Sequence, residues 1–292
     1  HQLKTARVRG KIEGCLMPKD NRTHPMNGRV LICAGSDSSG GAGIQADIKT
    51  VTALGCFAAT AITALTSQNT KGVFNVLDVP TSFLRQQMTV VLEDIGADVI
   101  KTGMLHNAEV IRTISNTLES LGDSSSLVID PVMVAKGGHS LLQTSAIDAL
   151  KIELIPKAHV LTPNIPEAEV LAGIEITSVD DMRRAGEYLL DMGPKSVLIK
   201  GGHLKDDTLT DILLTQSEEK LYSSPRLKTV HTHGTGCTLA SAVAAGIAQG
   251  LELQFATERA RKYVFEAIRS APGLGAGHGP LNHAHTISKM AI

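Results

Sequence analysis

Short apolar runs that alternate with longer amphipathic stretches are the feature that most limits how this chain can fold. The short aliphatic runs are 30–34, 97–101, 126–130, 158–162 and 196–200, and the stretches 57–66 and 72–79 resemble two further strands. Helical spacing of apolar residues covers 43–54, 82–94, 107–121, 145–154, 165–172, 179–192, 236–249 and 254–270. Strands that alternate with helices predict βαβ units and a mostly parallel sheet. Because no linker or repeat interrupts this pattern, we expect residues 29–292 to form one α/β domain.

The composition agrees with such a sheet and disfavours several classes of partner. Aromatic residues make up 3% of the chain and tryptophan is absent, so the core must consist mainly of aliphatic side chains, as in parallel sheets covered by helices. The formal net charge of −1 provides no field for holding nucleic acid. No apolar run reaches the roughly 18 residues that a membrane span requires. We therefore expect a small, soluble substrate.

The cysteines and the N-terminal residues bear on the compartment. Cys15, Cys33, Cys56 and Cys237 lie far apart and form no CxxC pair, which argues against both a disulfide framework and a zinc site. A reducing, cytoplasmic environment is the simple interpretation. Residues 1–29 contain seven Lys or Arg and two Asp or Glu, without apolar alternation. We expect residues 1–28 to be a disordered basic arm, or alternatively the remnant of an organelle-targeting sequence.

Polar and glycine-rich segments follow the predicted strands. These segments are Gly35–Gly43, Thr102–Met104, Asp130–Pro131, Thr162–Asn164 and Lys200–Gly202. In open α/β sheets, ligands bind beyond the carboxyl ends of the strands. The pattern therefore predicts an active site along one edge of the sheet.

The strongest local motif is the turn Gly234-Thr235-Gly236-Cys237, which opens a helix of small residues. Two glycines allow the backbone N–H groups to converge, and the helix N-terminus adds partial positive charge, an arrangement that binds phosphate or a phosphoryl group in transfer. Cys237 lies on the first turn, where the helix dipole is expected to lower the pKa of the thiol and let it accept a proton from a substrate hydroxyl. Alternatively, the turn only caps a packed helix, and Cys237 is a small buried residue. Of the eleven histidines, only His233 lies beside this turn.

The glycine-rich segment 35–47 has two interpretations. Residues 41–46 match the dinucleotide pattern GxGxxA, but the acidic residue that binds the ribose about 20 residues later is missing. A turn that admits a substrate ring against bare backbone explains the glycines equally well. The pattern GxxxxGK[ST] is absent, so ATP chemistry here would not be of the P-loop kind.

Acidic and basic residues at three strand ends suggest metal and nucleotide binding. Asp130 and Glu167 could hold Mg²⁺ as one or two carboxylates beside phosphate oxygens. Alternatively, Asn164 caps a helix and Glu167, three residues later, completes a capping box. Lys200, followed by two glycines, could contact a triphosphate or could be a surface lysine before a turn.

Taken together, these segments resemble the hydroxymethylpyrimidine and hydroxymethylpyrimidine-phosphate kinases of thiamine biosynthesis, within the ribokinase superfamily. The resemblance covers residues 29 to about 285 and rests on AGSDSSGGAGIQADIKT, ITALTSQNTKGV, KTGML, VIDPVMV, LTPNIPEAEVLAG, VLIKGGH, THGTGCTLASAVAAGIAQG and GHGPLNH. It implies a three-layer α/β/α fold with a mostly parallel sheet, and a homodimer. It also implies that ATP phosphorylates 4-amino-5-hydroxymethyl-2-methylpyrimidine and then its monophosphate.

The resemblance further implies roles for individual residues. Gly35, Asp47, Gln68, Met104 and Val132 should surround the pyrimidine, with Gln68 reading its edge and Met104 packing on its face. Asp130 and Glu167 should hold Mg²⁺, and Asn164 and Lys200 the nucleotide phosphates. Gly234, Thr235 and Gly236 should form an anion hole, beside which Cys237 acts as the base.

Cys237 also bears on the choice of substrate. Most of the superfamily has aspartate at this position, whereas the pyrimidine kinases resemble this chain in having GTGC. A pyridoxal kinase of the same fold is the nearest alternative. An NAD-dependent oxidoreductase and a non-catalytic ligand-binding module are more remote ones.

Overall fold

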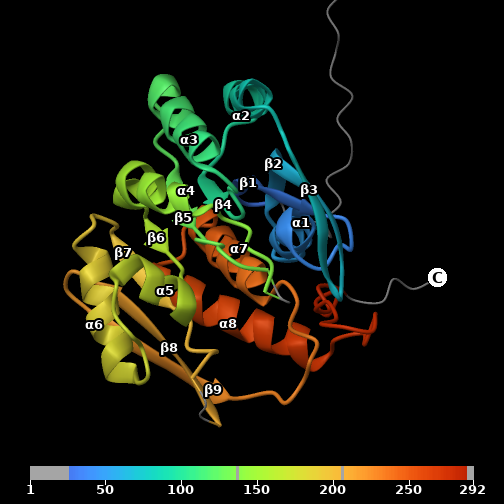
Figure 1. The fold of residues 1–292 in the computed structure, drawn as a ribbon, viewed down its shortest axis with the longest axis vertical. Coiled ribbons are helices and arrows are strands. Elements are labelled where there is room, and N and C mark those ends of the chain that lie inside the picture. The colour runs from blue at the N-terminus through green and yellow to red at the C-terminus, as the bar shows by residue number, and fades with distance from the viewer. Residues whose placement is uncertain (1–25, 136–137, 205–206, 288–292) are drawn as a thin grey trace, which may run out of the picture.

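The computed structural model describes residues 26–135, 138–204 and 207–287, and a long twisted sheet runs through this part of the chain (Figure 1). Its strand order is β3-β2-β1-β4-β5-β6-β7-β8-β9. The strands are β1 (Arg29–Asp37), β2 (Phe57–Asn69), β3 (Gly72–Asp78), β4 (Val99–Thr102), β5 (Ser126–Ile129), β6 (Val160–Leu161), β7 (Ser196–Ile199), β8 (Thr208–Thr215) and β9 (Glu219–Pro225). Strands β2, β1, β4, β5, β6 and β7 are parallel, whereas β3, β8 and β9 run antiparallel to their neighbours.

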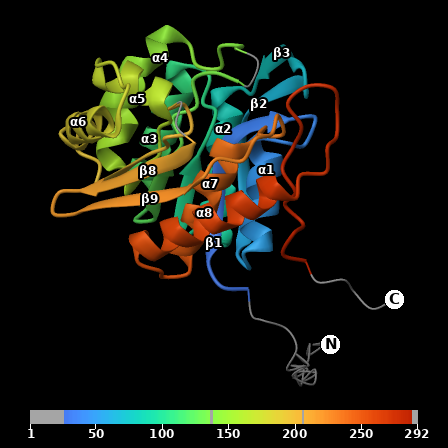
Figure 2. The same ribbon diagram turned by 90° about the horizontal axis from the view of Figure 1, so that it is seen from below.

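Helices cover both faces of this sheet. One face carries α2 (Thr81–Asp94), α3 (Ala108–Leu121), α4 (Thr144–Ala149), α5 (Ile165–Ala172) and α6 (Val179–Leu190), whose buried side chains share one apolar cluster with the sheet. The other face carries α1 (Gly43–Ala53), α7 (Thr235–Ala248) and α8 (Leu253–Arg269), which form two further clusters (Figure 2). The predicted three-layer α/β/α fold is thereby confirmed.

Local sequence explains where several helices begin and end. Asn107 and Ser178 cap α3 and α6, because each side chain accepts a hydrogen bond from the backbone three residues later. Gly122 and Gly173 end α3 and α5 in the left-handed conformation that glycine adopts without strain. The central strands β4 and β7 are buried along their whole length, as expected for parallel strands covered by helices on both faces.

The structure differs from the predicted elements in two places. The predicted helix 145–154 is α4 followed by a π-helical turn, η1 (Leu150–Leu154), and a 3-10 turn, η2 (Ile155–Lys157), because Pro156 has no N–H to continue an α-helix. The β8–β9 hairpin was not predicted from the sequence, although Ile212–Leu214 is a short apolar run in β8.

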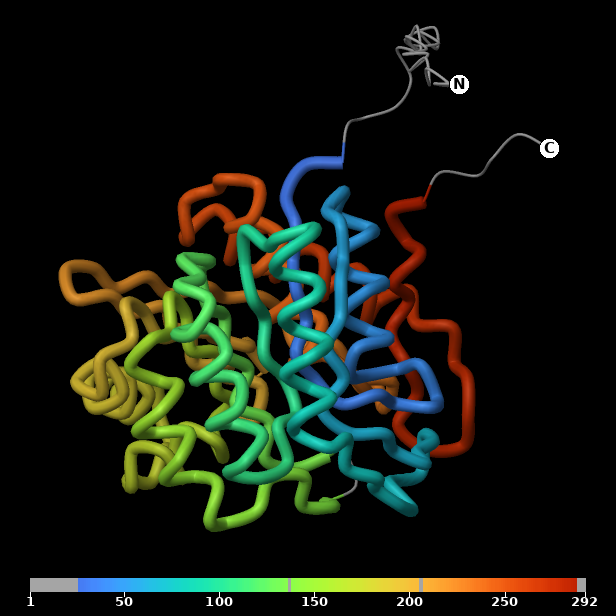
Figure 3. Tube along the Cα trace, turned by 90° about the horizontal axis from the view of Figure 1, so that it is seen from above, coloured from blue at the N-terminus to red at the C-terminus, as the bar shows by residue number. Residues whose placement is uncertain are grey.

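The segment that follows α8 returns to the carboxyl ends of the central strands. Figure 3 shows this red segment beside the blue and cyan loops of the N-terminal half. The N–H of His278 donates to the carbonyl of Thr70, and the N–H of His233 donates to the carbonyl of Gly279. The C-terminal segment therefore packs beside the predicted site.

Residues 1–25, most of the predicted N-terminal arm, lie outside the described residues. No helix of the described chain has the length and apolarity that crossing a bilayer requires.

Candidate active site

A cleft of about 1420 Å³ opens beyond the carboxyl ends of the parallel strands, where the sequence predicts a site. It is lined by every predicted site residue except Asp47: Gly35, Gln68, Met104, Asp130, Val132, Asn164, Glu167, Lys200, Gly234, Thr235, Gly236 and Cys237. Residues far apart in the sequence meet here because parallel strands end at the same edge of the sheet.

The GTGC turn forms the start of α7. Gly234 has φ 83° and precedes the helix as its N-cap. A Cβ at Gly234 would lie 1.9 Å from the carbonyl oxygen of Gly41, so only glycine lets this turn approach the loop that follows β1. Gly236 and Cys237 lie in the first helical turn, where the N–H groups have no intrahelical acceptor. A Cβ at Gly236 would lie 3.3 Å from the Nζ of Lys200, which places the turn beside a cation.

The thiol of Cys237 differs from the sequence-based expectation. Burial raises its pKa to about 12, and the positive charge of Lys101 opposes this effect only in part. The residue is partly exposed and lines the cleft, so water can reach it from that side. The pKa of this thiol is therefore raised rather than lowered, because desolvation of the thiolate dominates at this position.

Lys200, Asp130 and Glu167 form a charged group beside the GTGC turn. The Nζ of Lys200 lies 2.9 Å from Asp130 Oδ1 and 3.9 Å from Glu167 Oε2. Burial raises the pKa of Glu167 to about 7, with the nearby charge of Asp130 adding to the effect and that of Lys200 opposing it. Burial favours the neutral amine of Lys200, but Asp130 and Glu167 outweigh it and raise the pKa of the lysine.

These carboxylates satisfy the chemistry of a magnesium site. Asp130 Oδ2 is buried and lacks a hydrogen-bond partner among the described residues. No group of three His, Cys, Asp or Glu side chains forms a complete metal cage in the part of the chain described. Since Mg²⁺ in phosphoryl transfer needs only one or two carboxylates beside phosphate and water, the residues present fit it.

Asn164 and Glu167 also form the capping box that the sequence left open as an alternative. The side chain of Asn164 accepts from the N–H of Glu167, and Glu167 Oε2 accepts from the N–H of Asn164 at 2.8 Å. This box fixes the start of α5 and holds the Glu167 carboxylate at the wall of the cleft.

Gly35, Met104 and Val132 line the other end of the cleft. A Cβ at Gly35 would lie 2.9 Å from the sulfur of Met104, so glycine makes room for this side chain. The hydroxyl of Thr63 donates to the carbonyl of Met104 at 2.7 Å and fixes the backbone there. The result is an apolar surface against which a flat ring can pack.

Asp47 does not line the cleft, in contrast to the role that the resemblance implied. Its carboxylate is fully buried, accepts from both Lys101 and Ser241, and lies behind Lys101, which does line the cleft. Sequence reasoning missed Lys101, whose only signal was a charged residue at the end of an apolar run.

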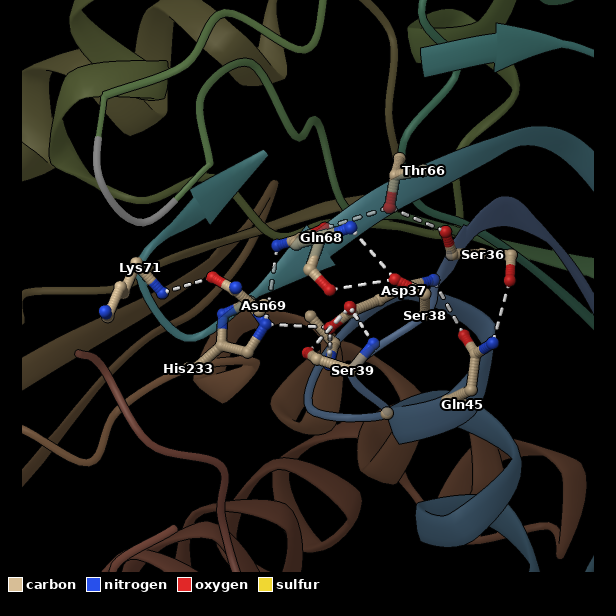
Figure 4. A network of polar contacts seen from close by, with 12 residues as sticks. Ser36, Asp37, Ser38, Ser39, Gln45, Thr66, Gln68, Asn69, Lys71 and His233 are labelled. Atoms are coloured by element: carbon tan, nitrogen blue, oxygen red, sulfur yellow. Dashed lines mark hydrogen bonds and ion pairs between the residues drawn. The ribbon is translucent and has the colours of Figure 1, made fainter. Parts of the chain in front are cut away.

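A second polar network, centred on Asp37, was not predicted from the sequence, in which only His233 was noted. The Nε2 of His233 lies 2.8 Å from Asp37 Oδ2 and 3.4 Å from the Nε2 of Gln68 (Figure 4). Asp37 also accepts from the N–H and hydroxyl of Ser39 and from the N–H of Ala42. The network joins the loop after β1 to Gln68 on β2 and to the GTGC turn.

Comparison with known proteins agrees with this geometry. A sequence profile described as phosphomethylpyrimidine kinase matches residues 37–282. The hydroxymethylpyrimidine/phosphomethylpyrimidine kinase of Bacillus subtilis is 47% identical over 256 residues, which cover 87% of this chain and 94% of that protein. The thiamine biosynthesis bifunctional protein ThiED of Geobacter sulfurreducens is 49% identical over 264 residues; the match covers 90% of this chain and 54% of that protein, so this chain spans about half of its length.

Solved structures show the same relationship. A phosphomethylpyrimidine kinase from Clostridium difficile 630 aligns with a TM-score of 0.73 and 45% identity, covering 82% of this chain and 99% of that one. The pyridoxal kinase of Bacillus subtilis, solved as an ADP complex, aligns with a TM-score of 0.81 and 35% identity, covering 88% and 98%. Since the profile and these relatives span most of the described residues, including the cleft, the chain belongs to the phosphomethylpyrimidine kinase family.

Proposed function

We propose that the protein transfers the γ-phosphoryl group of ATP to 4-amino-5-hydroxymethyl-2-methylpyrimidine and then to the resulting monophosphate. The observation that carries this proposal is the meeting, in one cleft, of the GTGC turn, the Lys200–Asp130 pair and the apolar surface at Met104. The names of two relatives, from Bacillus subtilis and Streptomyces coelicolor, combine hydroxymethylpyrimidine kinase with phosphomethylpyrimidine kinase and support both steps. The oxidoreductase and the non-catalytic module are set aside, because the family is one of kinases.

The residues of the cleft have separate roles in an in-line transfer of the phosphoryl group. Met104, Val132 and Gly35 hold the ring, and the carboxamide of Gln68 pairs with its polar edge. The N–H groups at the start of α7, with Thr235 and the bare backbone of Gly234 and Gly236, stabilise the charge on the phosphoryl group in transfer. Lys200 and Asn164 contact the phosphates of the nucleotide. Cys237, as thiolate, takes the proton of the attacking hydroxyl.

We further propose that Asp130 and Glu167 hold Mg²⁺ together with the phosphates. When bound, the ion neutralises charge on the β- and γ-phosphoryl oxygens. Asp130 is the stronger candidate of the two, because its buried Oδ2 has no partner in the described chain, whereas Glu167 Oε2 already caps α5.

A coupled assay of ADP release with the pyrimidine, and separately with its monophosphate, tests this function. Turnover that depends on the pyrimidine supports the proposal, and ATP consumption that the pyrimidine does not stimulate would refute it. A Glu167→Gln variant, which keeps the shape of the capping box, should need more Mg²⁺ for half-maximal rate. An unchanged metal titration would remove Glu167 from the metal site.

Pyridoxal phosphorylation is a second candidate. The observation that favours it is the closer structural alignment with pyridoxal kinases, among them the Staphylococcus aureus enzyme solved with AMP-PCP and pyridoxal, with a TM-score of 0.81. Measuring kcat/KM for both alcohols decides between them. We expect the pyrimidine to be preferred, since sequence identity is higher to the pyrimidine kinases.

We also propose the setting in which the enzyme works. Residues 29–292 act as one kinase domain, in the cytoplasm, as a homodimer. Free Cys33, Cys56 and Cys237 support a reducing compartment. Exposed apolar side chains on β2, β3 and α2 support self-association. An organelle remains the alternative compartment if residues 1–28 belong to a targeting sequence.

A further inference from the structure

Lys101 is a buried cation that has no role in the mechanism proposed above. It lies on β4, and its Nζ donates to both carboxylate oxygens of Asp47, at 2.9 and 3.0 Å. Neither side chain has any exposed surface. Buried charges of this kind cost free energy even when paired, and replacement by apolar residues is often neutral or stabilising. A task within the cleft would explain why the pair is present.

The pair lies beneath the first turns of α7, next to Cys237. The hydroxyl of Ser241 donates to Asp47 Oδ1 at 2.7 Å. Ser241 follows Cys237 by four residues, so both side chains project from the same face of α7. Lys101 and Cys237 both line the cleft, and a Cβ at Gly103 would lie 3.0 Å from the Lys101 Nζ. Ser241 and Asp47 thus hold the ammonium group on the side of α7 from which the thiol projects.

This arrangement matters for the transfer proposed above, on which the inference rests. Only the thiolate of Cys237 can take the proton of the acceptor hydroxyl. We propose that Lys101 is a positioning residue that stabilises the thiolate of Cys237, with Asp47 and Ser241 holding its ammonium group in place. The thiol first loses its proton to water in the open cleft. The thiolate then takes the hydroxyl proton while the hydroxymethyl oxygen bonds to the γ-phosphorus and the bond from phosphorus to ADP breaks.

The charges around the thiol support this assignment. Burial raises the pKa of Cys237 to about 12. The negative charges of Asp47 on α1 and Asp130 beyond β5 raise this pKa further, whereas the positive charge of Lys101 on β4 and the backbone N–H of Gly43 lower it. Lys200, beyond β7, also interacts electrostatically with the thiol. Burial favours the neutral amine of Lys101, but Asp47, Cys237 and Asp130 outweigh it and raise its pKa, so the ammonium stays charged. Lys101 is therefore the largest influence that favours the thiolate.

The test measures the thiol itself and needs neither ATP nor the pyrimidine. The rate of Cys237 alkylation by iodoacetamide is followed from pH 6.5 to 10 by mass spectrometry of the peptide that contains it. Lys101→Met removes the charge and keeps most of the side-chain length, and we expect alkylation at pH 8.5 to slow by at least about tenfold. Lys101→Arg keeps the positive charge, and we expect its alkylation rate to lie closer to that of the wild type than to that of Lys101→Met. Lys157→Met, which removes a lysine paired with Glu119 on the other face of the sheet, should change nothing.

The charge-conserving variant separates an electrostatic role from damage to the fold. If Lys101→Arg is alkylated as slowly as Lys101→Met, or if Lys101→Met leaves the pH profile unchanged, the proposal is wrong. Should Lys101→Met fail to fold, Ser241→Ala decides, because it removes a hydrogen bond that holds Asp47 beside Lys101, and an unchanged alkylation rate would contradict the proposal. The ADP-release assay on the wild type tests the proposed function separately, so failure of one leaves the other measurable.

Discussion

Cys237 is the residue on which turnover is expected to depend most. It lines the cleft, and burial raises the pKa of its side chain, so it is a thiol in the ligand-free protein. We expect Cys237→Ala to bind the pyrimidine with normal affinity but to lose about 10²–10⁴-fold in kcat, the usual contribution of general-base catalysis. Calorimetry and steady-state kinetics measure the two effects. Cys56→Ala, a change at a buried thiol outside the cleft, should keep its kcat; a fully active Cys237→Ala would refute the assignment as base.

Asp37 is expected to contribute to stability in a pH-dependent way. Burial alone would raise its pKa, but hydrogen bonds from His233 and Ser39 outweigh it and lower the pKa from 3.8 to about 2. The folded state therefore prefers the carboxylate, so its contribution of about 2 kcal/mol is present above pH 4 and disappears as the pH falls through 2. Asp37→Asn should lower the free energy of unfolding by that amount at pH 7. Urea unfolding at pH 7 and pH 3 should show the difference from wild type shrinking; a difference independent of pH would contradict this.

At the scale of elements, the site depends on close contact between the loop after β1 and the turn before α7. Gly234 combines φ 83° with a position at which an added Cβ would overlap the carbonyl oxygen of Gly41. We expect Gly234→Ala to destabilise the protein by at least about 2 kcal/mol, through strain and separation of the two loops, and to reduce turnover further. Gly72→Ala is the matched control, because its backbone is not left-handed and no atom lies within 4 Å of the added Cβ. Equal unfolding midpoints for the two variants would show that the contact is dispensable.

The hairpin β8–β9 shows another effect of element packing. Asp211 on β8 accepts from the N–H of Gly201 and from the Nε of Arg261 on α8, at 2.8 and 2.7 Å. These two contacts join the residue after Lys200 to α8 through the hairpin. The hairpin therefore supports the loop that carries Lys200, although its sequence shows no chemical motif.

At the scale of the whole molecule, one end of the sheet exposes apolar side chains. Leu65 on β2 pairs directly with Leu77 on β3, and they are 43% and 64% exposed; Phe74, in the edge strand itself, is 70% exposed. An edge strand with exposed apolar residues is a liability unless another surface covers it. We therefore expect the proposed homodimer to bury this end of the sheet.

Sedimentation of a Phe74→Glu/Leu77→Glu variant checks this expectation. The two charges should convert the dimer into a monomer at micromolar concentration without lowering the unfolding midpoint. Ile152→Glu, at an exposed apolar residue on the far helical layer, should stay dimeric. A double variant that remains dimeric would move the interface elsewhere.

The order of the elements and the edge of the sheet at which the site residues meet were predictable from the sequence, because short buried strands and helix starts leave strong local signals. The parallel arrangement brings Gly35, Asp130, Lys200 and Cys237 to one edge as a consequence of topology. The β8–β9 hairpin was less predictable, since the apolar run in β8 is only three residues long. The end of α4 was also less predictable, since Pro156 lies seven residues beyond the last residue of that helix. The role of Glu167 as a cap was one of two open alternatives, and only the hydrogen bonds show that the cap is formed.

Local pattern and the order of the motifs are enough to identify the α/β architecture, the edge of the sheet that carries the site, and the family. The three-dimensional packing of the chain sets the surroundings of individual charges. It placed Asp47 behind Lys101 rather than against the cleft, joined Asp37 to His233 and Gln68, and buried the Cys237 thiol deeply enough to raise its pKa. These outcomes depend on desolvation and on neighbours more than 50 residues away, as between Asp47 and Lys101, and no local pattern encodes either.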